Sequence, residues 1–266
     1  MKTIAEMLRF YIRKGMTANQ AECFACQKII LSKISKSPFA DKILIKGGIV
    51  MFCRSGNLRR ATMDLDFDFI RYDISDSSIR SFVELLNRFE DKYVLSVIDI
   101  EPLHQEDYRG KRVNIRIQDN TAEAVLKMDI GVHTLLGIGQ DSICFSFMDG
   151  EDGIILLANP PEQIFAEKAY SLAKHGAFSG RSKDIFDMYY LLKECELDKQ
   201  VVAQCLDLLT MKGKFGIGSK ADVYESIEDS LHNQMFRSRL YKIRNKWVKD
   251  DIETICQTII DFVYTL

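Results

Sequence analysis

The sequence predicts an α/β fold, in which a small mixed β-sheet with flanking helices precedes an all-helical C-terminal half. All strand-like segments lie between residues 43 and 155. Helical periodicity occurs before, within and after that region. From residue 160 onward, every apolar pattern has helical spacing. We therefore predict two domains, which are a sheet-containing core with N-terminal helices at 1–158 and a helical domain at 159–266.

Composition and charge exclude several classes of protein. The chain has 266 residues, of which 47% are hydrophobic and 28% charged, as in ordinary globular proteins. Its net charge of −2 gives no overall attraction to nucleic acid, so such binding would need a local basic patch. Seven irregularly spaced cysteines indicate a reducing cytoplasm. No signal sequence is visible, and no apolar run reaches the roughly 18 residues of a membrane span. We expect a cytoplasmic protein without a membrane partner.

Capping signals and periodicity place the elements of the first domain. Residues 1–15 form an amphipathic pattern, and Thr17 with Gln20 has the form of a capping box that begins a second helix ending near Ser35. A further helix is predicted at 76–89. Strands are predicted at 43–45, 64–69, 93–100 (mostly buried), 111–117 and 124–132, with a hairpin at 141–155.

The second domain begins at a proline pair. We expect Asn159 to cap a helix with Pro160 as its first residue. The loop 211–219 contains three glycines and two lysines, but it lacks the spacing of a phosphate-binding loop and is interpreted as a linker. Helices are predicted at 161–174, 182–194, 199–209, 220–234 and 249–264.

Three acidic residues alternate along one predicted strand of the segment 44–69, LIKGGIVMFCRSGNLRRATMDLDFDF. Side chains alternate between the faces of a strand, so Asp64, Asp66 and Asp68 share one face. Asp is a poor strand former and like charges repel, so these carboxylates need a cationic partner. Their hard oxygen ligands suit Mg²⁺ or Mn²⁺. A solvated strand face without a metal would show the same pattern.

A glycine pair precedes these acids. Gly47 and Gly48 follow Lys46 at the end of an apolar strand and precede an apolar segment that could begin a helix. Residues without Cβ let backbone approach a ligand, and a helix N-terminus offers free N–H groups to phosphate. Alone, a Gly-Gly pair is usually only a turn. Of Arg59 and Arg60, which precede the acids, we expect one to face the site and the other to lie on the surface.

A glycine turn followed by an Asp-x-Asp strand resembles the polymerase-beta-like nucleotidyltransferase superfamily. More specifically, KGG followed by RRATMDLDF looks like the AbiEii/AbiGii family of nucleotidyltransferase toxins. The resemblance implies that Asp64 and Asp66 are catalytic metal ligands and that Lys46, Gly47 and Gly48 hold the triphosphate. The chain departs from the superfamily in its longer interval between Gly48 and Asp64, and in Gly-Gly where Gly-Ser is usual. These departures leave the nucleotide undecided.

A further acidic residue lies in the predicted strand AVLKMDIGV at 124–132. Asp129 could cap a turn before Gly131. The resemblance implies instead that Asp129 is a third metal-binding carboxylate, supplied by a neighbouring strand, and this is the interpretation that we favour.

A second charged cluster lies in EQIFAEKAYSLAKHG and RSKDIFDMYYLL, within 162–192. Helical spacing places Lys168 inside an apolar stripe, where a lysine needs an anionic partner. On the next helix Asp184 points inward, and Asp187 is expected to be half exposed. The cluster could be one salt bridge between two helices. Its similarity to the second signature of the family implies that Lys168 contacts the nucleotide and that Asp184 orients it. Arg181 would meet phosphate, acceptor RNA or only solvent.

The resemblance implies a metal-dependent reaction that transfers NMP from an NTP to an acceptor and releases pyrophosphate. RNA such as tRNA is the implied acceptor, and the protein would be the toxin of a toxin–antitoxin or abortive-infection system with a cognate antitoxin. We expect the nucleotide between the two domains. Two alternatives stay open. The acceptor could be a protein or small molecule, which the acidic net charge favours, or the chain could be a non-catalytic nucleotide-binding member of the fold.

Overall fold

The computed structural model describes residues 2–89, 92–103, 110–178, 180–211, 216–243 and 246–266. They form two compact units, which are described separately. The first unit comprises Met1–Thr134 and Gln140–Asn159, and the second comprises Leu135–Gly139 and Pro160–Leu266. The short segment Leu135–Gly139 thus belongs with the helices, although strands precede and follow it. Our assignment of functional domains to 1–158 and 159–266 stays a prediction.

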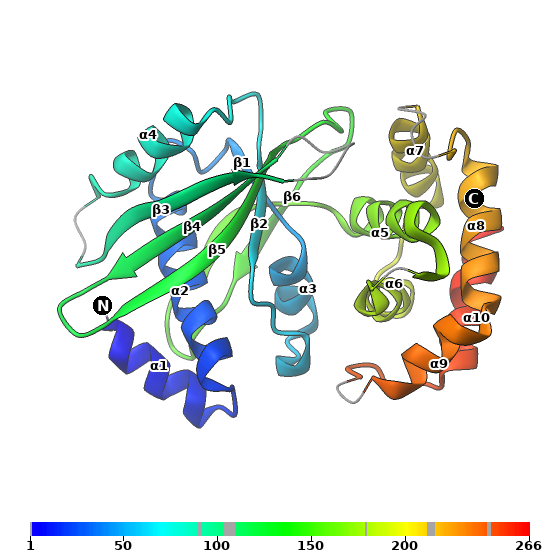
Figure 1. Ribbon diagram of the computed structural model, residues 1–266, viewed down its shortest axis with the longest axis horizontal. Coiled ribbons are helices and arrows are strands. Elements are labelled where there is room, and N and C mark those ends of the chain that lie inside the picture. Colours follow the sequence, from blue (N-terminus) through cyan, green and yellow to red (C-terminus); the bar gives the residue numbers. More distant parts are fainter. Residues whose placement is uncertain (1, 90–91, 104–109, 179, 212–215, 244–245) are drawn as a thin grey trace. The chain divides into compact units, whose positions relative to one another are not determined.

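The first unit contains one seven-stranded mixed sheet with the order β3-β4-β5-β2-β1-β7-β6 in the described residues (Figure 1). The pairs β1–β7 and β2–β5 are parallel and the others are antiparallel. This confirms the predicted α/β fold with a mixed sheet. The strands are β1 (Ile43–Lys46), β2 (Leu65–Phe69), β3 (Val94–Pro102), β4 (Lys111–Gln118), β5 (Glu123–Val132), β6 (Asp141–Phe145) and β7 (Ile154–Ala158).

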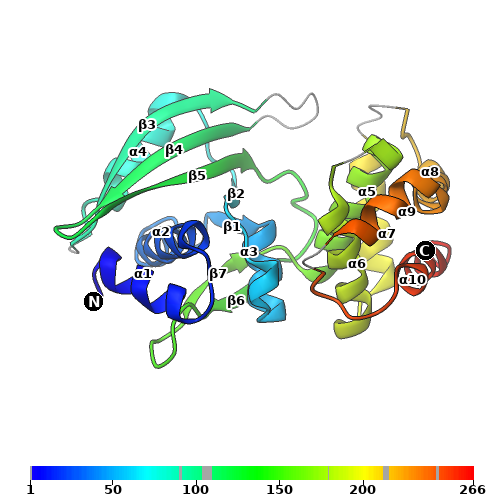
Figure 2. The ribbon, with the colours of Figure 1, turned by 60° about the horizontal axis from the view of Figure 1, so that its bottom comes forward.

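Helices of the first unit pack on the apolar face of the sheet. They are α1 (Ile4–Arg13), α2 (Ala18–Ser35), α3 (Gly48–Ser55), the short 3-10 helix η1 (Leu58–Arg60) and α4 (Asp76–Leu86). Phe67 and Phe69 of β2 are fully buried, and the ring of Phe82 from α4 lies 5.1 Å from that of Phe69. Figure 2 shows α2 beneath β5, and the Nζ of Lys33 in α2 donates to the Leu86 carbonyl at the end of α4, which places both helices on this face. The acidic side chains of β2 therefore point to the opposite face of the sheet.

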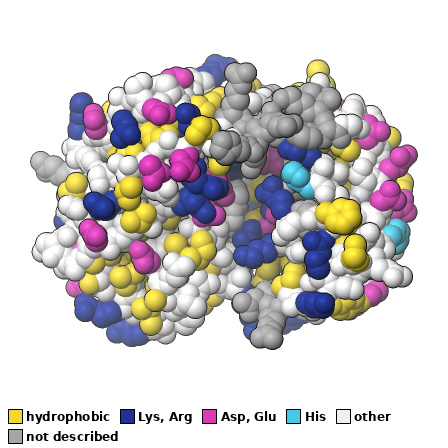
Figure 3. Space-filling model, in the orientation of Figure 1, with side chains coloured by type: hydrophobic (Ala, Val, Ile, Leu, Met, Phe, Trp, Pro, Cys, Tyr) yellow, Lys and Arg dark blue, Asp and Glu magenta, His cyan; other side chains and the backbone are white. Residues whose placement is uncertain are grey.

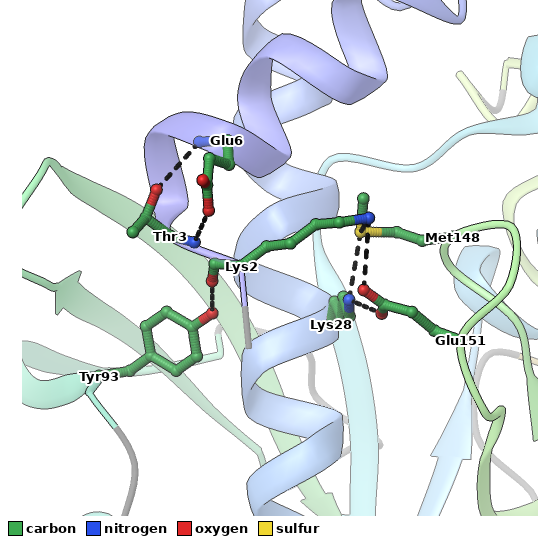
Figure 4. A network of polar contacts seen from close by, with 7 residues as sticks. All are labelled: Lys2, Thr3, Glu6, Lys28, Tyr93, Met148 and Glu151. Carbon is green, nitrogen blue, oxygen red and sulfur yellow. Dashed lines mark hydrogen bonds and ion pairs between the residues drawn. The ribbon is translucent and has the colours of Figure 1, made fainter.

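The N-terminal helix is fixed to the unit by a polar network (Figure 4). Thr3 and Glu6 form a capping box, in which the Glu6 N–H donates to the Thr3 Oγ1 at 3.2 Å. The Tyr93 hydroxyl donates to the Lys2 carbonyl, and Glu151 accepts from Lys28 of α2. These contacts hold α1 against both α2 and the start of β3, so the N-terminus is an integral part of the first unit.

One strand is more exposed than its apolar composition suggested. The predicted strand at 93–100 exists as β3, but Val94 and Ile98 are 51% and 44% exposed, and Leu95 is buried. The expectation that this strand is mostly buried is therefore wrong. The reason is its place at the edge of the sheet, beside a face that the helices of the unit do not cover.

The second unit is helical. Its elements are α5 (Pro161–His175), η2 (Gly176–Phe178), α6 (Ser182–Glu194), α7 (Lys199–Thr210), α8 (Lys220–His232), α9 (Gln234–Lys242) and α10 (Ile252–Val263). In the core, α5 packs against α6, α7 and α8, and the rings of Phe165 and Phe262 lie 5.0 Å apart. None of the helices in the described part of the chain has the length and apolarity that a bilayer span requires.

Two local expectations for this unit are wrong. Pro160 rather than Asn159 occupies the N-cap of α5, and no side chain caps the helix. Asn159 is buried instead, where its N–H donates to the Ile45 carbonyl at 3.2 Å. The helix predicted at 220–234 ends at His232, because the Asn233 side chain accepts from the Phe236 N–H and begins α9. Part of the linker predicted at 211–219, residues 212–215, lies outside the described residues.

Candidate active site

The turn between β1 and α3 brings backbone against an acidic side chain. Gly47 is the N-cap of α3 and has φ 72°, a conformation that other residues rarely adopt. A Cβ at this position would lie 2.9 Å from the Cγ and 3.1 Å from the Cβ of Asp66. Glycine therefore allows the Asp66 carboxylate to lie directly beside the first turn of α3. The free N–H groups of that turn favour negatively charged ligands.

The second glycine packs against a threonine and a buried cation. A Cβ on Gly48 would lie 2.6 Å from the Thr62 Oγ1 and 3.1 Å from the Nη1 of Arg60. Arg60 is 6% exposed, whereas Arg59 lies on the surface. Of the two arginines considered from the sequence, Arg60 is thus the one beside the glycine turn. Its guanidinium adds positive charge to the N-terminus of α3.

The register of the strands aligns five charged residues on the face of the sheet opposite the helices. Lys46 of β1 lies opposite Asp66 of β2, and Asp66 lies opposite Asp129 of β5. Asp129 in turn lies opposite Arg112 of β4, and Arg112 lies opposite Glu101 of β3. Directly opposed residues point to the same face of a sheet. We call this set the charged row; it brings Asp66 and Asp129 together from distant parts of the chain.

Two cations in this part of the sheet hold predicted metal ligands. The Nε and Nη2 of Arg112 donate to the two oxygens of Asp129 at 2.9 and 2.8 Å. These hydrogen bonds raise the pKa of the Arg112 guanidinium. The Nζ of Lys127 lies 2.8 Å from an oxygen of Asp64. All four side chains remain partly open to solvent, since their exposed fractions run from 20% for Asp129 to 38% for Arg112 and Asp64.

The predicted phosphate-binding lysine has a partner within the sheet. The Nζ of Lys46 lies 2.8 Å from the Oδ1 of Asp68. Asp68 is only 6% exposed, so this acid of β2 is buried beside the lysine. The pairing fixes Lys46 at the end of β1, next to the glycine turn.

Of the three carboxylates proposed as metal ligands, Asp66 and Asp129 lie opposite each other in register, and Asp64 directly precedes β2. Within the described residues, no three His, Cys, Asp or Glu side chains are grouped so that they could hold a metal ion. The chemistry of the donor set nevertheless suits a hard divalent cation, because Asp64, Asp66 and Asp129 supply only carboxylate oxygens. Binding would require Asp64 and Asp129 to exchange Lys127 and Arg112 for the metal.

In the second unit, Lys168 joins two aspartates of the neighbouring helix. Its Nζ lies 2.5 Å from Asp184 and 2.8 Å from Asp187. The exposed fractions of these three side chains are 12%, 13% and 0%, respectively. The expectation that Asp187 is half exposed is therefore wrong, because the packing of α6 on α5 buries it completely. The Nε of Arg181 donates to Asp184 at 2.9 Å.

Sequence reasoning missed the partners of the predicted ligands. Neither Arg112 nor Lys127 is among the site residues predicted from the sequence. In the strand predicted at 111–117, Arg112 alternates with apolar side chains that face the core. The pattern therefore indicates that Arg112 lies on the opposite face of the strand. Which acid lies opposite Arg112 depends on register, which the alternation alone does not give.

Comparison with solved structures finds distant similarities. The JHP933 protein of Helicobacter pylori has 15% sequence identity and a TM-score of 0.47, with 94% of this chain and 92% of that chain covered. An antigenic nucleotidyltransferase-like protein of Paracoccidioides brasiliensis has 17% identity and a TM-score of 0.41, with coverages of 72% and 88%. A comparison with curated proteins gives no match.

Comparison with protein families gives a match over most of the chain. The family described as "Nucleotidyl transferase AbiEii toxin, Type IV TA system" matches residues 29–253. This range includes the glycine turn, the charged row and the Lys168 cluster. The chain therefore belongs to the AbiEii family of nucleotidyl transferase toxins.

Proposed function

We propose that this nucleotidyltransferase transfers NMP from an NTP to an acceptor hydroxyl and that its activity depends on a divalent metal. The observation that carries the proposal is the position of the Asp66 carboxylate, beside Gly47 at the N-terminus of α3 and opposite Asp129. This arrangement joins a candidate metal ligand to backbone N–H groups that suit phosphate. An anionic ligand and the cations that neutralise it would thus meet at the same turn.

The proposed reaction is an in-line displacement at the α-phosphorus of the NTP. A bond forms between the acceptor oxygen and this phosphorus, and the bond to the bridging oxygen of the β-phosphate breaks. The acceptor loses its hydroxyl proton, and pyrophosphate leaves with the electron pair. Asp64, Asp66 and Asp129 would hold Mg²⁺ or Mn²⁺, which when bound would supply positive charge to the acceptor oxygen and the leaving pyrophosphate.

Other residues would bind and orient the triphosphate. The N–H groups at Gly47 and Gly48 would donate to phosphate oxygens, with the Arg60 guanidinium beside them. Lys168 would add a positive charge to the phosphates, and Asp184 would orient that lysine.

For the acceptor we propose RNA, with tRNA as the first substrate to test. The family is that of a type IV toxin–antitoxin system, which supports a role as a toxin with an antitoxin partner in the cytoplasm. A second candidate is a protein or small-molecule acceptor. It is supported by the net charge of −2 and by the mixture of acidic and basic side chains on the described part of the face shown in Figure 3.

The test is transfer of radiolabel from each α-labelled NTP with Mg²⁺, total RNA and cell extract. Asp66→Asn should lower the transfer by about 100-fold or more, because it removes a charged ligand of the metal. The matched control is Asp99→Asn, which changes an acid of β3 whose partner is Asn114 at 2.8 Å. This control should leave transfer unchanged.

The destination of the label separates the candidates. Label in a small-RNA band that Asp66→Asn abolishes would establish RNA as the acceptor. Label on protein or on a small molecule would favour the second candidate. Full transfer by the Asp66→Asn variant would disprove the assigned site, and no transfer by the natural sequence, with no metal-dependent stabilisation by any NTP, would leave a non-catalytic protein.

A further inference from the structure

An aromatic side chain of the second unit stands almost free of protein contact. Phe178 is 81% exposed at the end of η2, the short turn that joins α5 to α6. Single exposed hydrophobic residues are common on protein surfaces and need no special explanation. Two further observations set Phe178 apart, namely the bracing of its backbone and the composition of the hollow beside it.

The backbone that carries Phe178 is held by other helices. α5 ends at His175, and its C-cap Gly176 has a φ of 59° that turns the chain sharply. The Arg239 side chain of α9 donates to the Ala177 carbonyl, and α8 also packs on η2. The exposure of the ring is therefore built into the turn and is not the result of a loose chain end.

A shallow, open hollow of about 330 Å³ lies beside the ring. Its lining includes His175, Phe178, Gly180 and Arg181. It thus places an aromatic residue beside Arg181, whose side chain is 56% exposed. This composition suits a flat aromatic ligand that carries negative charge.

Arg181 connects the hollow to the Lys168 cluster. It donates to Asp184 at 2.9 Å and to the Ser171 hydroxyl at 3.0 Å, and Asp184 also accepts from Lys168. These contacts orient the guanidinium while half of the side chain stays accessible. A phosphate bound to Arg181 would therefore join the network of ion pairs that includes Lys168.

We propose that Phe178 is a stacking platform for a nucleobase and that Arg181 binds a phosphate of the same nucleotide. The inference rests on the proposed function and deepens it, because it assigns a place for the base that the transfer site leaves unassigned. An aromatic ring stacks on any base, so the platform tolerates different nucleotides. The base belongs either to the incoming NTP or to the end of the RNA acceptor, since the chemistry of recognition is the same.

A fluorescent ring at this position makes stacking directly visible. The natural chain has one tryptophan, Trp247, which is 9% exposed and gives a constant background. The variant Phe178→Trp is titrated with each NTP, with a single-stranded RNA oligomer and with inorganic triphosphate as a probe without a base. Met211→Trp is the matched control, because Met211 is 80% exposed and does not line the hollow.

Quenching of Phe178→Trp by an NTP would assign the platform to the incoming base, and quenching by RNA alone would assign it to the acceptor. Either result supports the proposal if inorganic triphosphate and the Met211→Trp control give none. Equal quenching by inorganic triphosphate, or no quenching by any probe, would overturn it. The replacement Phe178→Ala should weaken binding of the same nucleotide by about 5- to 150-fold.

These results separate the platform from the transfer reaction. If Phe178→Trp does not respond while the natural protein transfers label and Asp66→Asn does not, the platform is disproved and the proposed function stands. If nucleotides quench Phe178→Trp but no label is transferred to any acceptor, the nucleobase site stands and the proposed function fails.

Discussion

The two charged clusters of this protein are built in opposite ways. On the sheet, Asp64 and Asp129 pair with cations that are 37% and 38% exposed. In the helical unit, Lys168 is 12% exposed and contacts Asp187, which has no solvent exposure at all. Both clusters pair carboxylates with basic side chains, but Asp64 and Asp129 are partly exposed to water, whereas Lys168 and Asp187 are buried.

The difference indicates different roles. Ion pairs in contact with water are weak, so the partners of Asp64 and Asp129 can be exchanged for a metal at little cost. A buried pair is costly to break, because the remaining charge cannot be hydrated. We infer that the sheet cluster rearranges during the reaction, whereas the Lys168 cluster keeps one geometry throughout.

The largest expected effect is that of Lys168→Met. It leaves Asp184 and Asp187 buried without this cation and should lower the free energy of unfolding by about 3–5 kcal/mol. The matched variant Lys127→Met removes the partner of the half-exposed Asp64 and should cost no more than about 1 kcal/mol. Urea denaturation of both variants measures the contrast, and equal losses of stability would show that the two clusters do not differ as proposed.

The next effect concerns the glycine turn. Gly47→Ala imposes a positive φ on alanine, which costs about 1–3 kcal/mol, and brings its Cβ against Asp66. Gly56→Ala also imposes a positive φ, of 61°, on alanine, but its added Cβ has no atom within 4 Å. The first variant should therefore lose more stability than the second, and it should also lose label transfer. Similar losses in both assays for the two variants would argue against a close approach of Asp66 to the turn.

A smaller effect tests whether a metal can replace the cation that pairs with a carboxylate of the sheet. Arg112→Met frees Asp129 and should change the free energy of unfolding by about 1 kcal/mol or less. It should also increase the stabilisation of the protein by Mn²⁺, because the metal no longer competes with the guanidinium. Arg116→Met on the same side of β4 is the control, since its ion pair with Glu123 is long at 3.9 Å. A metal response that is the same in both variants would contradict the competition.

The smallest effect is a pH dependence away from both clusters. Burial raises the pKa of Asp119, but hydrogen bonds from Thr121 and from the Ile4 and Ala122 N–H groups lower it more, so its pKa is depressed overall. The unfolded chain therefore binds more protons, and the contribution of Asp119 is complete above its unfolded pKa of about 3.9. It is lost as the pH falls through the folded pKa. Urea unfolding between pH 5 and about pH 3 should show a shallower decline for Asp119→Asn than for the natural protein; parallel curves would rule this contribution out.

Local signals in the sequence predicted much of the fold. The capping box of Thr17 and Gln20 begins α2 as expected, and α6 has the predicted bounds Ser182–Glu194. Such signals depend on residues a few positions apart, so they survive any tertiary arrangement. The helix α9 was missed because its short polar sequence buries only Phe236 and Leu240.

Contacts between distant segments could not be predicted in the same way. The alternation of β2 placed Asp66 on the polar face, but only the parallel register with β5 brings Asp129 opposite it. Likewise, helical spacing left Asp187 at the edge of the apolar arc, and its burial depends on how α6 packs on α5. Phe178 carried no signal, since the exposure of a turn residue is decided by the surrounding helices.

The segment Leu135–Gly139 has a consequence for biosynthesis. Its residues Leu135 and Ile138 are 4% and 6% exposed, and the segment belongs with helices that begin only at Pro160. On the ribosome these apolar residues emerge before any of the helices that share their unit, and before the last two strands of the sheet. The nascent chain must therefore keep these apolar residues from other partners until translation has supplied the helices.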